Sequence, residues 1–135
     1  MSYPLTDIEG VDRNIAAILK SVGVRSTEGL IEAARTCRRR QALAKKTGLS
    51  ERQLLCWANM ADRMRIPGVS KDHAALLGAA GVDTVRELKY RNPQNLAAAM
   101  KMANDKRILV RLLPSEKVAA RWIGHAKTLP LKITY

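Results

Sequence analysis

Aromatic residues, cysteines and histidines are scarce in this chain of 135 residues. It contains no phenylalanine, and aromatic residues make up only 4% of it, so leucine, alanine, valine and isoleucine must fill the core. Cys37 and Cys56 are the only cysteines, and in an intracellular chain such a pair is more often two free thiols than a disulfide. His73 and His125 lie far from them in the sequence, so no metal-ligand spacing arises, and we expect neither a metal nor a cofactor.

Long apolar runs are also missing. No stretch approaches the roughly 20 apolar residues that a membrane-spanning helix needs, and residues 1–10 lack the organisation of a signal peptide. We therefore expect a cytoplasmic protein that does not enter a membrane.

Acidic residues are half as numerous as basic ones. The chain has 24 Lys and Arg against 12 Asp and Glu, which gives a net charge of +12 at pH 7. Such an excess favours polyanionic partners and carries no information about the fold. Nucleic acid is the first candidate and an acidic protein surface the second. A membrane surface is less favoured, because no long basic amphipathic helix carries large apolar residues.

Patterns typical of enzymes are absent too. We find no paired carboxylates in an apolar stretch, no nucleophile elbow and no glycine-rich phosphate loop, so we expect no catalytic activity. Trp57 and Trp122 lie on apolar helical stripes, which predicts core positions and not stacking platforms for single strands. We expect His73 and His125 to be structural, partly buried residues.

The most informative feature that is present is an internal repeat. Residues 8–30 recur as residues 66–88, and glycine and small apolar residues are the ones that repeat. The identical pairs are Ile8 and Ile66, Gly10 and Gly68, Val11 and Val69, Ala16 and Ala74, Ala17 and Ala75, Leu19 and Leu77, Gly23 and Gly81, Val24 and Val82, and Leu30 and Leu88. A weaker match aligns Ser50 and Trp57 with Ser115 and Trp122.

Helical periodicity and capping residues extend along almost the whole chain, and strand patterns are nearly absent. The expected helices span about residues 12–21, 26–34, 36–47, 50–65, 70–80, 84–90, 92–100, a short stretch within 104–114, and 115–129. We expect the tail, residues 131–135, to pack as an extended strap. The sequence thus predicts an all-α fold in which two helix-hairpin-helix units, residues 1–65 and 66–135, pack as one compact domain.

The segment Ile66-Pro67-Gly68-Val69, followed directly by a helix, is typical of the hairpin in a helix-hairpin-helix motif. Its glycine permits a tight turn, and the first amides of the next helix point outward, where a phosphate can accept hydrogen bonds at the positive end of the helix dipole. We therefore predict a phosphate site at Gly68, Val69, Ser70 and Lys71. The same geometry also occurs where a hairpin merely joins two packed helices.

The first hairpin supplies a weaker candidate, at Gly10 and Arg13. Asp12 would repel a phosphate, and we expect it to cap the following helix instead.

A basic run is the strongest charge feature. Six cations occur within 12 residues that include no acid: Arg35, Arg38, Arg39, Arg40, Lys45 and Lys46. At helical spacing Arg38, Lys45 and Lys46 share one face, and Leu43 points to the opposite side. This face is predicted to bind anions, although a charged run of this kind also serves as a solvated, solubilising face.

Several segments together resemble a bacterial domain-of-unknown-function family built from tandem helix-hairpin-helix units. They are Ile8-x-Gly10-Val11, Gly23-Val24-x-Ser26, Arg40-x-Ala42-Leu43-Ala44, Thr47-Gly48, Arg65-Ile66-x-Gly68-Val69, Gly81-Val82-Asp83-Thr84 and Asn92-Pro93. The resemblance implies DNA binding without sequence preference, by analogy of fold. Members of the family often carry glycine where this chain has Asp12 and Ser70.

We therefore expect a non-enzymatic protein that binds nucleic acid, DNA in preference to RNA, through the Gly68 hairpin and the basic face of residues 35–46. It is expected to be a monomer of the bacterial cytoplasm, associated with the nucleoid. The alternative is a helical scaffold or adaptor that binds an acidic protein partner.

Overall fold

The chain folds entirely into helices, as its periodicity predicts. The structure is a computed structural model, and it describes residues 2–135. Within that range there are eight α-helices, one short 3-10 helix and no strand. Their bounds are η1 Leu5–Asp7, α1 Arg13–Ser21, α2 Thr27–Ala33, α3 Cys37–Thr47, α4 Glu51–Arg63, α5 Lys71–Ala79, α6 Val85–Leu88, α7 Pro93–Lys106 and α8 Glu116–Thr128.

Polar side chains set the start of every one of these α-helices. In each case the side chain before the helix accepts a hydrogen bond from the amide three residues further on. The capping residues are Asp12, Ser26, Thr36, Ser50, Ser70, Thr84, Asn92 and Ser115. Each cap contributes about 1 kcal/mol, which explains why sequence alone placed the helix starts well.

Matched segments of the two halves fold alike. α1 and α5 both contain nine residues, and both follow a glycine turn and a capping residue. α4 and α8 both contain 13 residues, with Trp57 and Trp122 at the same position in each. The halves differ in the short helix between these elements, since α2 has seven residues and α6 has four.

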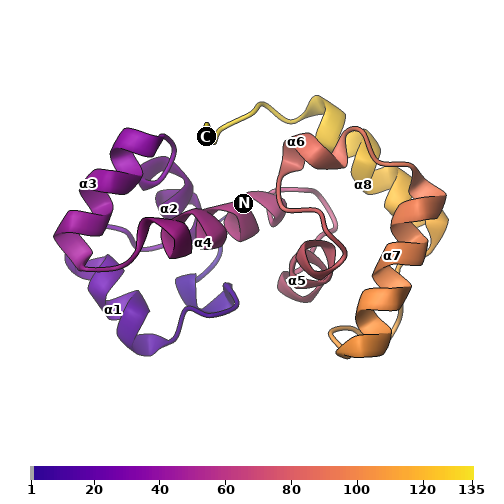
Figure 1. Cartoon of the computed structure of the whole chain (residues 1–135), viewed down its shortest axis with the longest axis horizontal. Coiled ribbons are helices and arrows are strands. Elements are labelled where there is room, and N and C mark those ends of the chain that lie inside the picture. Colours follow the sequence, from indigo (N-terminus) through magenta and orange to yellow (C-terminus); the bar gives the residue numbers. More distant parts are fainter. Residues whose placement is uncertain (1) are drawn as a thin grey trace.

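A single hydrophobic core connects the halves. Leucine, alanine, valine, isoleucine and methionine dominate it, together with Trp57 and Trp122, which are 4% and 3% exposed. Figure 1 shows α1, α2 and α3 at one end of the molecule and α7 and α8 at the other, with α4 leading from the first half into the centre, where α5 and α6 pack against it. The chain is therefore one integrated unit.

The tail returns to the first half and forms the expected strap. In Figure 1 it leaves α8 and crosses back above α4. The Thr134 amide donates to the Arg35 carbonyl at 2.9 Å, and the Tyr135 hydroxyl donates to Asn59 Oδ1 at 2.8 Å. Ile133 is buried between these contacts. The last residues thus hold the two halves together.

The helix expected within residues 104–114 does not form. Instead α7 extends to Lys106, and residues 107–114 have no regular structure. The Asn104 side chain fixes this loop, because its Oδ1 accepts from the Leu109 and Val110 amides at 2.8 and 3.1 Å and its Nδ2 donates to the Val110 carbonyl. These bonds occupy backbone groups that a helix would require. Ile108 and Leu112 consequently remain 81% and 84% exposed.

Candidate nucleic-acid interface

The basic run of α3 divides into buried and exposed cations. Arg40 is only 4% exposed, and it donates to the Ala34 carbonyl and to the Thr134 carbonyl, both at 2.8 Å. Its prediction as a nucleic-acid contact is therefore wrong. The residue anchors the C-terminal strap to the first half. A sequence pattern could not separate it from its neighbours, because its second acceptor lies 94 positions away in the sequence.

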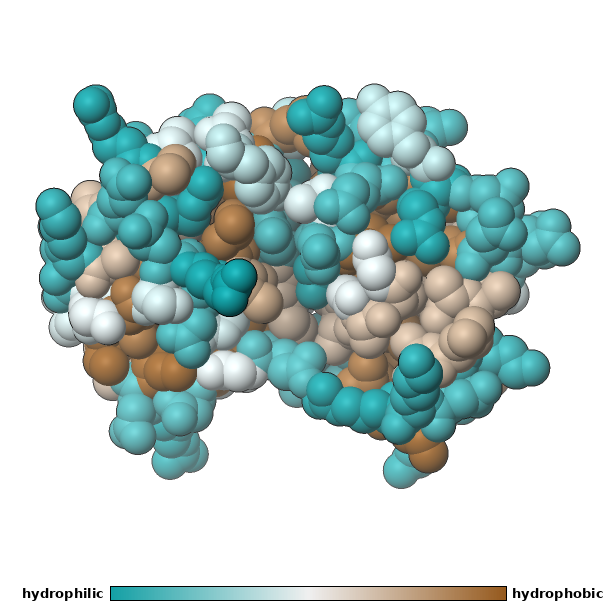
Figure 2. All heavy atoms as spheres, viewed as in Figure 1, coloured by the Kyte–Doolittle hydropathy of each residue, from teal (hydrophilic) through white to brown (hydrophobic). Residues whose placement is uncertain are grey.

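The other cations of the run are exposed, as expected. Arg38, Lys45 and Lys46 form what we call the α3 surface, and Leu43 is buried on the opposite side. Arg39 forms an ion pair with Glu32 of α2 at 3.0 Å, and Arg35 approaches the same carboxylate at 3.8 Å. Figure 2 shows hydrophilic side chains projecting from the end of the molecule that carries α3. The strongest uncompensated charge of the run thus lies on the α3 surface.

The two hairpins share one turn geometry. Gly10 and Gly68 have φ angles of +91° and +86°, a conformation that L side chains seldom adopt. The amide after each glycine turns back into the hairpin, because Val11 donates to the Ile8 carbonyl and Val69 to the Ile66 carbonyl. The Val69 amide is therefore not available to a phosphate, contrary to our prediction, and Val69 itself is buried.

Capping side chains occupy part of each helix start. Asp12 Oδ1 accepts from the Ile15 amide at 2.9 Å, so its predicted capping role is confirmed. Ser70 Oγ accepts from the His73 amide at 3.3 Å in the same way. In the described part of the chain, the amides of Lys71 and Asp72 have no acceptor. They remain available at the positive end of α5.

The first hairpin faces an acidic hollow. This hollow, of about 530 Å³, brings Gly10 of the first hairpin beside Lys71 of the second. Its carboxylates outnumber its cations, since Asp7, Glu9, Asp12 and Asp72 line it against Lys71 and Arg107. Glu9 forms an ion pair with Arg107. Arg13 is exposed but does not line this hollow. The first hairpin is consequently a poor site for a phosphate.

The second hairpin has a cationic face. Pro67 and Gly68 line a hollow of about 280 Å³ with Arg121, Trp122 and His125 of α8, and no acidic residue lines it. We call these five residues the Gly68 surface. Trp122 Nε1 lies 3.5 Å from the position a Gly68 Cβ would occupy, and the His73 ring lies 5.2 Å from the tryptophan ring. The predicted half-burial of His73 and His125 is confirmed.

Arg121 and His125 were missed as functional candidates from the sequence. The available signal was the spacing of Lys117, Arg121 and His125, which places three basic side chains on one helical face. At the equivalent positions of the first half, α4 carries Cys56 and Met60, which line a groove whose other wall is α5. In the first half this helical face is covered by α5, which belongs to the second half. The matching face of α8 lines the hollow beside Gly68.

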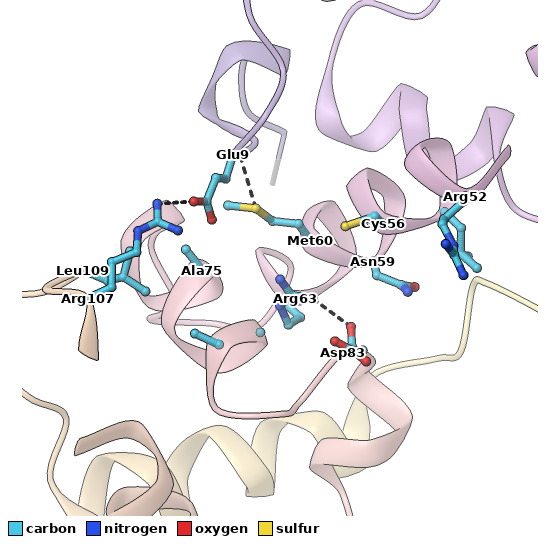
Figure 3. A pocket seen from close by; sticks show the side chains of 13 residues that line it. Glu9, Arg52, Cys56, Asn59, Met60, Arg63, Ala75, Asp83, Arg107 and Leu109 are labelled. Atoms are coloured by element: carbon cyan, nitrogen blue, oxygen red, sulfur yellow. Dashed lines mark hydrogen bonds and ion pairs between the residues drawn. The ribbon is translucent and has the colours of Figure 1, made fainter. Parts of the chain in front are cut away.

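The groove between α4 and α5 has a volume of about 440 Å³, and Figure 3 shows Arg63 near its centre. Arg63 Nε donates to the Ala74 carbonyl at 2.9 Å and Nη1 to the Asp83 carbonyl at 2.8 Å. Burial lowers the pKa of Arg63, and the nearby Asp83 carboxylate partly offsets that effect. Arg63 therefore joins α4 to both α5 and the turn before α6.

A second buried charge lies at the end of α4. Asp62 Oδ1 accepts from Arg65 Nε at 2.6 Å, and both side chains are largely buried. Burial raises the pKa of Asp62 even though Arg65 opposes the change. Arg65 also donates to the Pro130 carbonyl. This pair ties the end of α8 to the junction of the halves and is not a contact surface.

The predicted contacts do not form one continuous surface. In Figure 1 α3 lies at one end of the molecule, whereas α5 and α8 belong to the other half. The α3 surface and the Gly68 surface are thus separate, and the acidic hollow of the first hairpin is a third environment.

These features define an all-α protein with two similar halves and separate cationic surfaces. The model of the family described as Domain of unknown function (DUF4332) matches residues 9–129. Because this match spans most of the sequence, the chain belongs to that family. No curated protein and no solved structure matches the chain.

None of the helices among the described residues combines the length and the apolar character needed to cross a bilayer. Nor do three or more His, Cys, Asp or Glu side chains gather within residues 2–135 in a way that would hold a metal ion.

Proposed function

We propose that this protein consists of two helix-hairpin-helix units and binds duplex nucleic acid, DNA in preference to RNA, through the phosphate backbone. The Gly68 surface is the primary contact and the α3 surface the second. Such a protein is non-enzymatic, does not read bases, and would act on the nucleoid in the bacterial cytoplasm. The first hairpin, at Gly10, does not contact nucleic acid in this proposal and only joins two helices.

The observation that carries the proposal is the cationic hollow beside Gly68. There the turn of the hairpin lies next to the Arg121 and His125 side chains, with no carboxylate in the lining. A guanidinium presents several donors to phosphate oxygens. Contacts of this kind fix position on a duplex without recognising sequence.

Fluorescence anisotropy with labelled duplex DNA, duplex RNA and single-stranded DNA across a salt series tests the proposal. If about five phosphates are contacted, the logarithm of affinity should fall with the logarithm of salt at a slope of about −4 to −5. Binding would then weaken by more than about a hundredfold between 50 and 200 mM salt.

Variants locate the contact. Arg121→Ala should weaken duplex binding and reduce the salt slope by about one. Lys127→Ala is the matched control, because it removes one charge from another face of the same helix. Replacing Arg38, Lys45 and Lys46 together by alanine tests the α3 surface. Equal losses of affinity for Arg121→Ala and Lys127→Ala would mean that binding depends on overall charge and not on the Gly68 surface. No binding at low salt would overturn the proposal.

One observation favours the second candidate, an adaptor for an acidic protein. Ile108 and Leu112 are 81% and 84% exposed on a loop that Asn104 holds in place, and Arg111 lies between them in the sequence. Ordered aliphatic side chains beside a cation suit a protein surface of mixed apolar and acidic character. Replacing both by serine would impair such an interaction and leave DNA binding through the Gly68 surface unchanged.

A further inference from the structure

The groove between α4 and α5 joins the two halves but differs chemically from the Gly68 surface. Apolar side chains make up much of its wall, and arginines lie at its centre and its mouth. Its volume of about 440 Å³ falls in the range of small-molecule sites and is too small for a duplex. Any ligand that it holds must therefore be compact.

Arg63 provides a donor that points to such a ligand. The residue is 7% exposed, and two of its three guanidinium nitrogens are bonded to backbone carbonyls. Its Nη2 has no acceptor among the described residues. Every fully buried side-chain nitrogen in that part of the chain has a hydrogen-bond partner, so Nη2 must retain some contact with solvent. Arg63 lines the groove, and so does Gly78, against which Nη2 lies, so this donor is at the wall of the groove.

The backbone of α5 makes room for that donor. A Cβ atom on Gly78 would lie 2.7 Å from Arg63 Nη2. Glycine in a helix interior costs about 1 kcal/mol relative to alanine, so this position sacrifices helix stability to accommodate the guanidinium. The placement of Nη2 is thus built into the fold.

The charge of the groove is only partly compensated. Within the described chain, neither Arg63 nor Arg52 has a carboxylate within 4.0 Å, whereas Glu9 already forms an ion pair with Arg107. Asp83 also lines the groove, beyond ion-pair distance of Arg63. Arg63 donates only to neutral carbonyls, and the nearby Asp83 carboxylate compensates its charge only in part, so an added anion would stabilise it further. Figure 3 shows Arg52 at one end of the α4 face that also carries Asn59 and Arg63.

We propose that the α4–α5 groove binds a small molecule with a carboxylate or phosphate group, which Arg63 Nη2 and Arg52 hold while Leu55 and Ala79 contact its apolar part. The anion supplies the missing counter-charge. This proposal does not depend on nucleic-acid binding, because the Gly68 surface shares no residue with the groove.

Nuclear magnetic resonance of the full chain tests the site. Inorganic phosphate and glutarate are titrated separately at constant ionic strength, with chloride as the reference anion. The signals to follow are the Arg63 Nε–H and the backbone amides of Gly78 and Asp83. We expect saturable shifts at these groups with at least one probe, and the probe that saturates identifies the preferred anion. Saturation with neither would overturn the proposal.

Four variants separate a site from general charge. Arg52→Ala should weaken binding by about tenfold, and Ala79→Leu should abolish it by filling the groove at its exposed edge. Arg25→Ala and Ala98→Leu are the matched controls, because they make the same changes at exposed positions outside the groove and outside both proposed nucleic-acid surfaces. Controls within about twofold of the parent support the site. Equal effects in variants and controls, or shifts that grow linearly with concentration, would overturn it.

Discussion

The two hairpins of this protein have the same backbone and opposite surroundings. Gly10 and Gly68 adopt nearly equal positive φ angles, and at each glycine a tryptophan Nε1 lies close to the position that a Cβ atom would occupy. Carboxylates line the hollow at Gly10, and the neighbouring helix α4 presents Cys56 and Met60. Around Gly68 the corresponding helix presents Arg121 and His125. The repeat thus preserves the turn and changes the chemistry.

This difference gives two matched segments of the chain different surroundings. In the first half, the hairpin face receives α5, with Ala75, Gly78 and Ala79 forming the opposite wall of the groove. In the second half the same helical face lines the hollow beside Gly68, where it presents Arg121 and His125. Packing against α5 therefore accounts for the residues of the first half, whereas our proposal assigns those of the second hairpin to binding. Changes at matched positions should have unequal effects.

The largest effect is expected at the two buried arginines, Arg63 at the junction of the halves and Arg40 beside the tail. Arg63→Met leaves two carbonyls unpaired at the junction of the halves and should lower the free energy of unfolding by about 3 kcal/mol. Arg40→Met should lower it by about 1 to 2 kcal/mol, because the carbonyl of Thr134 lies on the surface tail and can be hydrated. Urea unfolding followed by circular dichroism measures both. A larger loss at Arg40 would contradict the view that Arg63 is the main link.

Two helical glycines should respond with opposite signs. Gly124→Ala in α8 meets nothing within 4 Å and should stabilise the protein by up to about 1 kcal/mol. Gly78→Ala gains the same helix propensity, but its Cβ displaces a guanidinium that two hydrogen bonds hold. We expect a net loss of about 1 kcal/mol. Stabilisation by both changes, measured as a rise in melting temperature, would show that Arg63 moves freely.

Local signals were sufficient to predict most of the fold. Helix starts follow from capping residues, and the glycine turns follow from the repeat, because both depend on interactions within a few residues. The loop after α7 was mispredicted, since Asn104 competes for backbone groups that apolar periodicity does not reveal.

The candidate site was less predictable, because it depends on contacts between distant segments. Arg40 looks like its exposed neighbours until the tail is placed against it. Arg121 and His125 gain importance only when α8 lies beside Gly68. The exposed face with Arg38, Lys45 and Lys46 was predicted correctly, since helix geometry alone determines it.

Exchange of the capping residues would test the functional asymmetry of the hairpins. Ser70→Asp keeps a good helix cap, so stability should change by less than about 0.5 kcal/mol. Its carboxylate lies close to the proposed phosphate contact and should weaken duplex binding by about tenfold at 50 mM salt. Asp12→Ser should leave binding within about twofold of the parent, because the first hairpin is not in the interface. Anisotropy titrations measure both, and a gain in binding from Asp12→Ser would give the first hairpin a role.

The smallest effect is expected on stability at high pH, through Tyr135 in the C-terminal strap. Partial burial raises the pKa of Tyr135 to about 12. The folded chain therefore retains this proton at pH values where the unfolded chain, with an ordinary tyrosine pKa of about 10, has lost it. Stability should accordingly fall as pH rises from about 10 to 12. Because 60% of the Tyr135 surface is exposed, solvent screening keeps this loss small.

Tyr135→Phe removes the titration and also the hydrogen bond to Asn59. Comparing urea midpoints at pH 9.5 and 11.5 isolates the effect, since lysines and the other tyrosines titrate in both proteins. The parent should lose more stability than the variant over this interval, and an equal loss would mean that the strap does not hold the Tyr135 proton.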